Sequence, residues 1–277
     1  MDCPDLNDVN LHDGILNLGG RCFARNKNLR WITMPGVREV KNNAFDGCRN
    51  LDYVEFGNQL DIIRQLAFTR CYSLQCLTMS SVRAIEWRAF HECQSLVDIV
   101  FGVELERIEN EAFYKCIRLT QITIPLKNDM IEGDPFSSCP SLGTVYLVGG
   151  IHKTVSYLHF EGWRNSMKEE FDRINKILPY THSREKTATI QQWIQSVIDR
   201  FEYYRVAHNQ LLKEVATSLE LAVWKAKLDL DVDEDTLEPL GQGKEGSKGA
   251  RKKRRITSGA SISIVIKNVL PFLRVPI

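Results

Sequence analysis

The residues of this chain most suited to metal or redox chemistry are its eight cysteines, all in the first half. They are Cys3, Cys22, Cys48, Cys71, Cys76, Cys93, Cys116 and Cys139. Clustered thiols can bind zinc or form disulfides. Zinc sites place paired ligands only a few residues apart, whereas most of these cysteines recur every 22 or 23 residues, with no paired histidine at ligand distance. The spacing indicates a structural repeat, and we expect no metal and no cofactor.

The repeat is visible when the chain is aligned with itself. Five copies of Ala-Phe-x-x-Cys, one with proline in place of alanine, share the register: 44–48, 67–71, 89–93, 112–116 and 135–139. Phe23 and Asn26 fit one unit earlier, which makes six units. Each unit has a leucine three residues after the Cys or Asn: Leu29, Leu51, Leu74, Leu96, Leu119 and Leu142. One such unit cannot bury its apolar edge alone, so the sequence predicts a β-solenoid of about six turns around a ladder of Phe and small, reduced thiols.

Each leucine precedes a short alternating segment. Its inward positions are apolar, as in Ile32 and Met34 or Ile122 and Ile124. This alternation predicts a strand with one buried face. A second apolar pair, such as Val37 and Val40, lies before each Phe and decays in the last unit.

The outward positions of these strands are the candidate partner-binding face, because alternation directs them away from the core. They are Trp31, Thr33, Tyr53, Glu55, Thr78, Asp98, Val100, Gln121, Thr123, Thr144 and Tyr146. Exposed aromatic side chains among them are candidate hot spots, since binding energy concentrates in large flat side chains.

The motif Ala-Phe-x-x-Cys-x-x-Leu-x-x-Ile-x-Ile, with an upstream Val-x-x-Ile, resembles the BspA-type leucine-rich repeat of bacterial surface proteins and microbial eukaryotes. The resemblance covers residues 13–148. It implies a curved right-handed solenoid used for adhesion or protein binding, with no catalytic residues. Many relatives are exported, but the acidic segment Met1–Leu6 lacks the features of a secretory signal. We therefore expect an intracellular protein, cytoplasmic or nuclear.

The region 151–228 is rich in helix formers. Helix one is predicted over 153–178, ending before Pro179, and helix two over 185–228. Helix two carries an apolar seam: Ile190, Ile194, Val197, Phe201, Tyr204, His208, Leu211 and Val215. This seam predicts either an antiparallel hairpin with helix one, favoured by the short connection, or a homo-oligomeric coiled coil through 190–228. We expect the helices to cap the last repeat. This region and the tail are similar to the C-terminal part of some leucine-rich-repeat proteins of unicellular algae.

The segment 229–255 turns acidic and then Gly-rich and basic, which is typical of a flexible linker. Its basic run is a candidate nuclear-import signal or nucleic-acid contact, or a solvated run paired with the nearby acidic cluster. The run is Arg251, Lys252, Lys253, Arg254 and Arg255. The last segment, 256–277, is apolar but too short to span a bilayer. We expect it to add a strand to a sheet edge or to lie on a membrane surface.

Charge and motifs exclude several functions. The chain has 36 Lys and Arg against 35 Asp and Glu, so its net charge of +1 attracts neither nucleic acid nor membrane globally. No activated nucleophile, carboxylate pair or phosphate-binding loop is recognisable. We expect a non-enzymatic interaction or scaffold protein that binds another protein through its repeat face. A nuclear or chromatin-associated adaptor using 251–255 is the alternative, and a cell-surface adhesin is less favoured.

Overall fold

The computed structural model describes residues 7–148 and 161–234, with side chains as far as residue 225. The chain divides into two compact units, Met1–Tyr204 and Arg205–Ile277. The basic run 251–255, the apolar segment 256–277 and most of the predicted linker lie outside the described residues.

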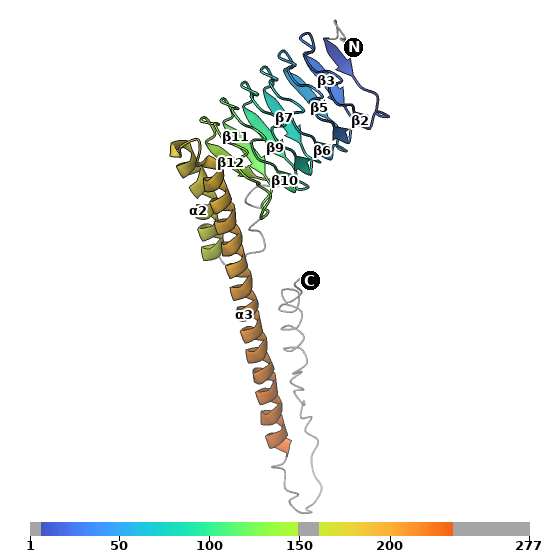
Figure 1. The fold of residues 1–277 in the computed structure, drawn as a ribbon. Helices are drawn as coiled ribbons and strands as arrows, with labels where there is room; N and C mark the ends of the chain where they lie inside the picture. Colours follow the sequence, from blue (N-terminus) through green and yellow to red (C-terminus); the bar gives the residue numbers. More distant parts are fainter. Residues whose placement is uncertain (1–6, 149–160, 235–277) are drawn as a thin grey trace, which may run out of the picture. The chain divides into compact units, whose positions relative to one another are not determined.

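The solenoid is built on one four-residue strand per turn. These strands are β3 (Trp31–Met34), β5 (Tyr53–Phe56), β7 (Cys76–Met79), β9 (Asp98–Phe101), β11 (Gln121–Ile124) and β12 (Thr144–Leu147). They form two parallel sheets, β1-β3-β5 and β7-β9-β11-β12 (Figure 1). The predicted solenoid of about six turns is confirmed. Strand β1 (Asp8–Asn10) lies upstream of residue 13, where we expected the repeats to begin. The sequence pattern does not predict this strand, because it lacks the Phe and Leu residues that mark the other turns.

The second residue of each upstream apolar pair, such as Val40, lies in a third parallel sheet, which consists of two-residue strands. These are β2 (Asn17–Leu18), β4 (Glu39–Val40), β6 (Ile62–Ile63), β8 (Ala84–Ile85) and β10 (Arg107–Ile108), paired in that order. The second residue of each strand is buried, which explains why this position is always apolar. In the last repeat, where the pattern decays, only an isolated bridge between Ile108 and Ile131 remains.

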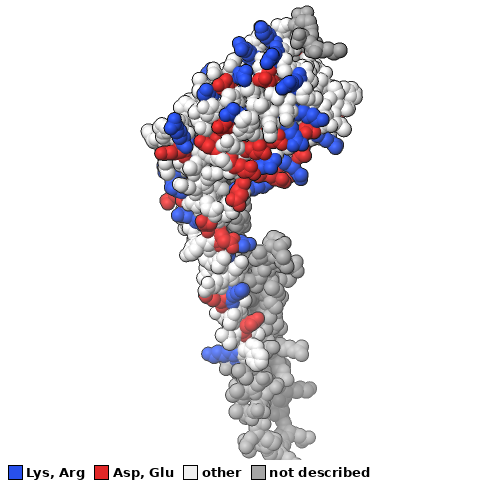
Figure 2. All heavy atoms as spheres, viewed as in Figure 1, with Lys and Arg blue, Asp and Glu red and all other residues white. Residues whose placement is uncertain are grey.

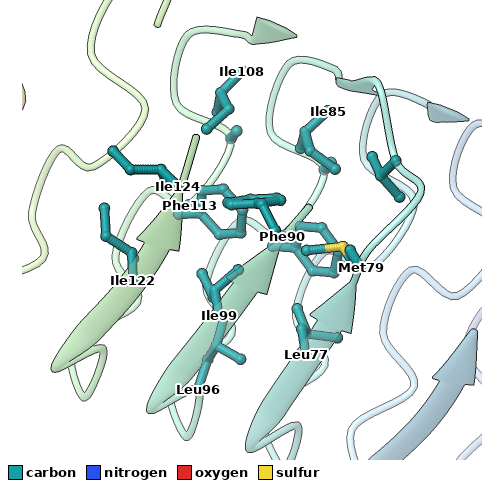
Figure 3. Close-up of a cluster of buried hydrophobic side chains, with 14 of the residues drawn as sticks. Leu77, Met79, Ile85, Phe90, Leu96, Ile99, Ile108, Phe113, Ile122 and Ile124 are labelled. Atoms are coloured by element: carbon teal, nitrogen blue, oxygen red, sulfur yellow. The ribbon is translucent and has the colours of Figure 1, made fainter. Parts of the chain in front are cut away.

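Between the long strands and the short strands lies a ladder of aromatic rings. Phe23, Phe45, Phe68, Phe90, Phe113 and Phe136 stack in succession. Neighbouring ring centroids are 4.7 to 5.7 Å apart, and the rings are tilted by no more than 10°. Figure 3 shows Phe90 and Phe113 among inward side chains of the long strands, such as Ile99, and of the short strands, such as Ile85.

A second ladder consists of buried thiols. Cys48, Cys71, Cys93, Cys116 and Cys139 are free and buried, and each Sγ donates to the carbonyl of the Phe one turn earlier at 2.9 to 3.3 Å. Burial raises the pKa of Cys48 to about 12, which keeps the thiol protonated as a donor. The expected ladder of buried cysteines is confirmed.

Two positions in almost every turn adopt left-handed backbone. The first set is Arg21, Asn43, Leu66, Arg88 and Glu111, and the second is Arg25, Gly47, Arg70, Glu92, Lys115 and Ser138. Only one of these eleven is glycine, although such φ values cost other residues about 1–2 kcal/mol. Hydrogen bonds to the next turn, such as Arg70 N to His91 O at 2.8 Å, hold this backbone in place and offset the cost.

The helical region begins in the described residues with α2 (Glu161–Ile177), followed by the 3-10 helix η1 (Leu178–Tyr180) and α3 (Lys186–Glu234). The start predicted at 153 lies outside the described residues. Pro179 lies in η1, so the helix ends where proline predicts. Helix α3 continues past Leu228 to Glu234, into the acidic run that we expected to open a linker, because no Gly or Pro interrupts it there. No helix in the described part of the chain is both long and apolar enough to cross a membrane.

Candidate functional site: the outward strand face

The predicted site residues lie on the outward side of the long strands. The register forms one row from Trp31 and Tyr53 and a parallel row from Thr33 and Glu55. Beyond the junction of the two sheets, the first row continues with Cys76, Asp98, Gln121 and Thr144. The second row continues with Thr78, Val100, Thr123 and Tyr146. All of these side chains are exposed or half-buried, while their inward neighbours form the core.

Aromatic side chains are concentrated at the N-terminal end of this face. The rings of Trp31 and Tyr53 are neighbours, with centroids 6.2 Å apart and planes 46° apart. Tyr53 is 50% exposed. Beside them, Thr33 Oγ1 donates to Asn10 Oδ1 at 2.7 Å, which links this end of the face to β1. Tyr146, also 50% exposed, lies on β12 at the other end of the array, so the structure does not bring all three predicted hot spots together.

The middle of the face offers contact surface without reactive machinery. It carries the exposed thiol of Cys76, one carboxylate at Asp98, and the side chains of Val100, Gln121 and Thr123. Among the described residues, no group of three His, Cys, Asp or Glu side chains could hold a metal ion. This arrangement can make hydrogen bonds and van der Waals contacts with a partner.

A side chain of α2 covers the edge of the last long strand, β12. Asn175 of α2 accepts a hydrogen bond from Val145 N at 2.8 Å through Oδ1 and donates to Val145 O at 3.3 Å through Nδ2. A single side-chain amide thus pairs with the edge of β12 as another strand would. Edge pairing of this kind removes a site of uncontrolled strand addition.

Helix α3 caps the remaining part of the last turn. Lys186 is only 1% exposed, and its Nζ donates to the carbonyls of Leu142 and, at 2.7 Å, Pro140. Burial lowers the pKa of this amine. Phe136 N donates a hydrogen bond to Thr187 Oγ1 at 3.4 Å, and Gln191 Nε2 donates to Ile131 O at 2.9 Å. The expected cap is confirmed, with both helices contributing. The repeat pattern in the sequence does not predict these polar contacts.

The two helices form an antiparallel hairpin as far as Tyr204. Trp193 Nε1 donates to Glu170 O at 2.9 Å, and near the other end the rings of Trp163 and Tyr204 stack with centroids 5.0 Å apart. The seam residues Ile190, Ile194 and Val197 are buried.

Glu170 is the polar centre of this hairpin. Its Oε1 accepts hydrogen bonds from Arg173 Nη2 at 2.7 Å and from Ser196 Oγ at 2.8 Å. Burial alone would raise the pKa of this carboxyl, but the Arg173 and Ser196 hydrogen bonds outweigh it and the pKa lies below its usual value.

Parallel turns with internal Phe and Cys ladders define a leucine-rich-repeat protein. The chain matches the BspA type leucine rich repeat region in six copies, over residues 1–85 and 78–183, and it belongs to this family. The family is a non-enzymatic interaction fold, and its members generally bind other proteins.

Solved structures with similarity to the chain include two leucine-rich proteins and a vaccine antigen. A leucine rich repeat protein of T. pallidum is 26% identical with a TM-score of 0.48, covering 56% of this chain and 84% of its own. A leucine rich cell surface protein of Faecalibacterium prausnitzii is 24% identical with a TM-score of 0.39, covering 52% of this chain and 48% of its own. The pneumococcal vaccine antigen PcpA is 14% identical with a TM-score of 0.38, covering 55% and 39%. No curated protein matches the chain.

Proposed function

We propose that this chain is a non-enzymatic scaffold protein that binds another protein through the outward face of its long strands. The observation that carries the proposal is the pair of neighbouring aromatic side chains, Trp31 and Tyr53, on an open strand face. Tyr and Trp are the side chains most enriched among residues that dominate binding energy. Thr33 and Glu55 in the adjacent row supply polar groups around them.

The rigidity of the solenoid supports this assignment. The backbone of each turn is hydrogen-bonded to the next, as in Phe45 N to Ala67 O at 2.7 Å and Phe68 N to Ala89 O at 2.7 Å. A surface fixed in this way loses little conformational freedom when a partner binds, so more of the contact energy appears as affinity.

The free cysteines support an intracellular location. Each cysteine of the described residues, including exposed Cys22 and Cys76, is a free thiol. Free thiols persist in the reducing environment of the cytosol and nucleus. The adaptor alternative depends on the basic run 251–255, which lies outside the described residues.

The proposed binding face is tested by a Trp31→Ala, Tyr53→Ala, Tyr146→Ala variant. Partners are first identified by affinity capture with the intact chain and mass spectrometry, and the affinity for the purified partner is then measured. We expect a loss of at least about tenfold, since removing a hot-spot aromatic costs 2 kcal/mol or more. Tyr180→Ala, Tyr203→Ala is the matched control, because both side chains are exposed on the helical region. Unchanged affinity in the triple variant with an unchanged melting temperature would place the site elsewhere.

A second candidate function is self-association through α3. Two apolar residues of the seam, Leu211 and Val215, are 40% and 49% exposed. Light scattering should give a dimer mass for the intact chain and a monomer mass for a folded Leu211→Asp, Val215→Asp variant. A monomer in both cases excludes this assembly.

A further inference from the structure

A basic surface lies on the segment that connects the Phe ladder to the long strand in the first three turns and in the fifth turn. We call it the basic ridge. It consists of the exposed side chains Arg25, Lys27, Arg49, Arg70, Lys115 and Arg118. In Figure 2, Asp and Glu gather in a band over the side of the solenoid that carries β6 and β10, whereas Lys and Arg dominate the turns near the N-terminus.

Backbone register brings four of these side chains together. Arg25 N donates to Asp46 O at 2.7 Å and Gly47 N to Thr69 O at 2.8 Å, which places Arg25, Gly47 and Arg70 at one position of three consecutive turns. In the neighbouring row, Asn50 Nδ2 donates to Lys27 O at 2.6 Å, so Lys27 and the equivalent Arg49 lie on adjacent turns. Since parallel strands are about 4.8 Å apart, the four cations lie within about 10 Å along the solenoid axis.

The cations beside the short strands and those on the basic ridge differ in whether they form ion pairs. Beside the short strands, arginines form ion pairs, as Arg64 does with Glu39 and Glu86 at 2.7 Å and Arg107 with Glu109 at 3.3 Å. On the basic ridge, only Lys115 has a carboxylate of the described residues within 4.0 Å, that of Glu92. The cations of the first three turns have no ion-pair partner within the part of the chain that the structure describes.

The ridge also contains a flat side chain beneath one of its cations. The guanidinium of Arg49 lies 5.6 Å from the ring centroid of Tyr72, which restrains the cation while leaving it exposed. Glu92, in the fourth turn, interrupts the row of cations between Arg70 and Lys115. A continuous phosphate backbone would be repelled at Glu92, whereas a short acidic peptide would meet only the first three turns.

We propose that the basic ridge binds an acidic segment of a partner protein, whose Asp and Glu side chains pair with Arg25, Lys27, Arg49 and Arg70. This surface is distinct from the aromatic strand face, so the two could engage separate parts of one partner. The attraction steers association and fixes orientation, because complementary charges act before close contact forms.

The test uses the intact chain and a fluorescent peptide of alternating Glu and Gly, followed by anisotropy at low salt. The variant is Arg25→Ser, Lys27→Ser, Arg49→Ser, Arg70→Ser. Serine is compatible with the left-handed positions, since Ser138 occupies the equivalent position with φ of 59°. The control removes four cations from the short-strand side: Arg38→Ser, Lys41→Ser, Arg83→Ser, Arg107→Ser.

We expect the ridge variant to bind the peptide at least about tenfold more weakly than the wild type, while the control stays within about twofold. Binding by the wild type should weaken as ionic strength rises. No binding by the wild type, equal loss in the variant and control, or tighter binding of a single-stranded oligonucleotide would overturn the proposal. The Trp31→Ala, Tyr53→Ala, Tyr146→Ala variant should bind the peptide normally, which separates this test from that of the strand face.

Discussion

The solenoid and its helical cap solve the same problem, the burial of apolar edges, by different means. Within the solenoid each turn after the first repeats one arrangement: a Phe on the aromatic ladder and a Cys thiol that donates a hydrogen bond to the preceding turn. At the cap, each contact occurs once, as in the amide of Asn175 on β12 and the amine of Lys186 on the loop carbonyls. The core is therefore stabilised by identical apolar contacts, and its end by single polar side chains.

This difference predicts how far along the solenoid a single substitution reduces stability. Removing one internal ring should weaken neighbouring turns together, because each ring contacts the rings before and after it. Removing one capping side chain should instead loosen the last turn while the preceding turns keep their partners.

The largest effect is expected from Phe90→Ala, at the middle of the ladder. Phe90 is fully buried and stacks on both Phe68 and Phe113, so its removal leaves a cavity. We expect a loss of about 3–5 kcal/mol in the free energy of unfolding measured by urea denaturation. Tyr203→Ala, at a 68% exposed position, should stay within about 0.5 kcal/mol. A loss below about 1 kcal/mol for Phe90→Ala would mean that the ladder is not a shared core.

The next effect concerns close approach of backbone between turns. A Cβ on Gly102 would lie 1.7 Å from the carbonyl oxygen of Ser80 in the preceding turn. Gly102→Ala must shift one turn, and we expect a loss of about 3 kcal/mol in thermal or urea unfolding. Gly162→Ala in α2 is the control, because no described residue lies within 4 Å of a Cβ built at this position, and it should change the free energy of unfolding by less than about 1 kcal/mol. Equal results for the two variants would contradict the tight stacking of turns.

A smaller and more local effect is expected at the cap from Asn175→Ala. The change leaves Val145 N and O without their side-chain partner, at a cost of about 1–3 kcal/mol. Hydrogen exchange should accelerate at β12 amides and remain slow at β7 and β9. Asn209→Ala, on the exposed surface of α3, serves as the control. Acceleration throughout the solenoid would show that the cap and core unfold as one unit.

The smallest effect is a dependence of cap stability on pH. The pKa of Glu170 is lowered in the folded protein, so its charged form stabilises the fold at pH values above the ordinary carboxyl pKa, about 4.3. That contribution should be lost as pH falls through the lowered pKa. Glu170→Gln should therefore unfold about 1 kcal/mol more easily at pH 7, with the difference disappearing in acid. A difference that persists unchanged in strong acid would mean that the carboxylate charge is not responsible.

The same contrast explains what could be predicted from the sequence. The period of Phe and Cys, repeated several times, predicted the core, and alternation around Ile122 predicted which strand residues point outward. Strand β1 was missed because it lacks those landmarks. The capping roles of Asn175, Lys186 and Gln191 could not be predicted, since each is a single polar residue whose partner is distant in sequence.

The basic ridge was also missed, although the sequence carried its signal. Arg25 and Arg70 are far apart along the chain but occupy the same phase of the repeat, while Gly47 occupies it in the turn between them. Sorting charged residues by their phase in the repeat would have placed them on one surface. The strand face is different: alternation identifies the exposed positions but not which of them a partner contacts.

The register between turns has a consequence for how such a protein can change in length. Internal turns meet through equivalent backbone hydrogen bonds, as Phe45 N to Ala67 O and Phe68 N to Ala89 O illustrate, so one internal turn can follow another. Duplication or loss of one genetic unit would lengthen or shorten the molecule by a single rung of about 4.8 Å. Related proteins that differ in the number of turns would present binding surfaces of different length while keeping the same helical cap on the last turn.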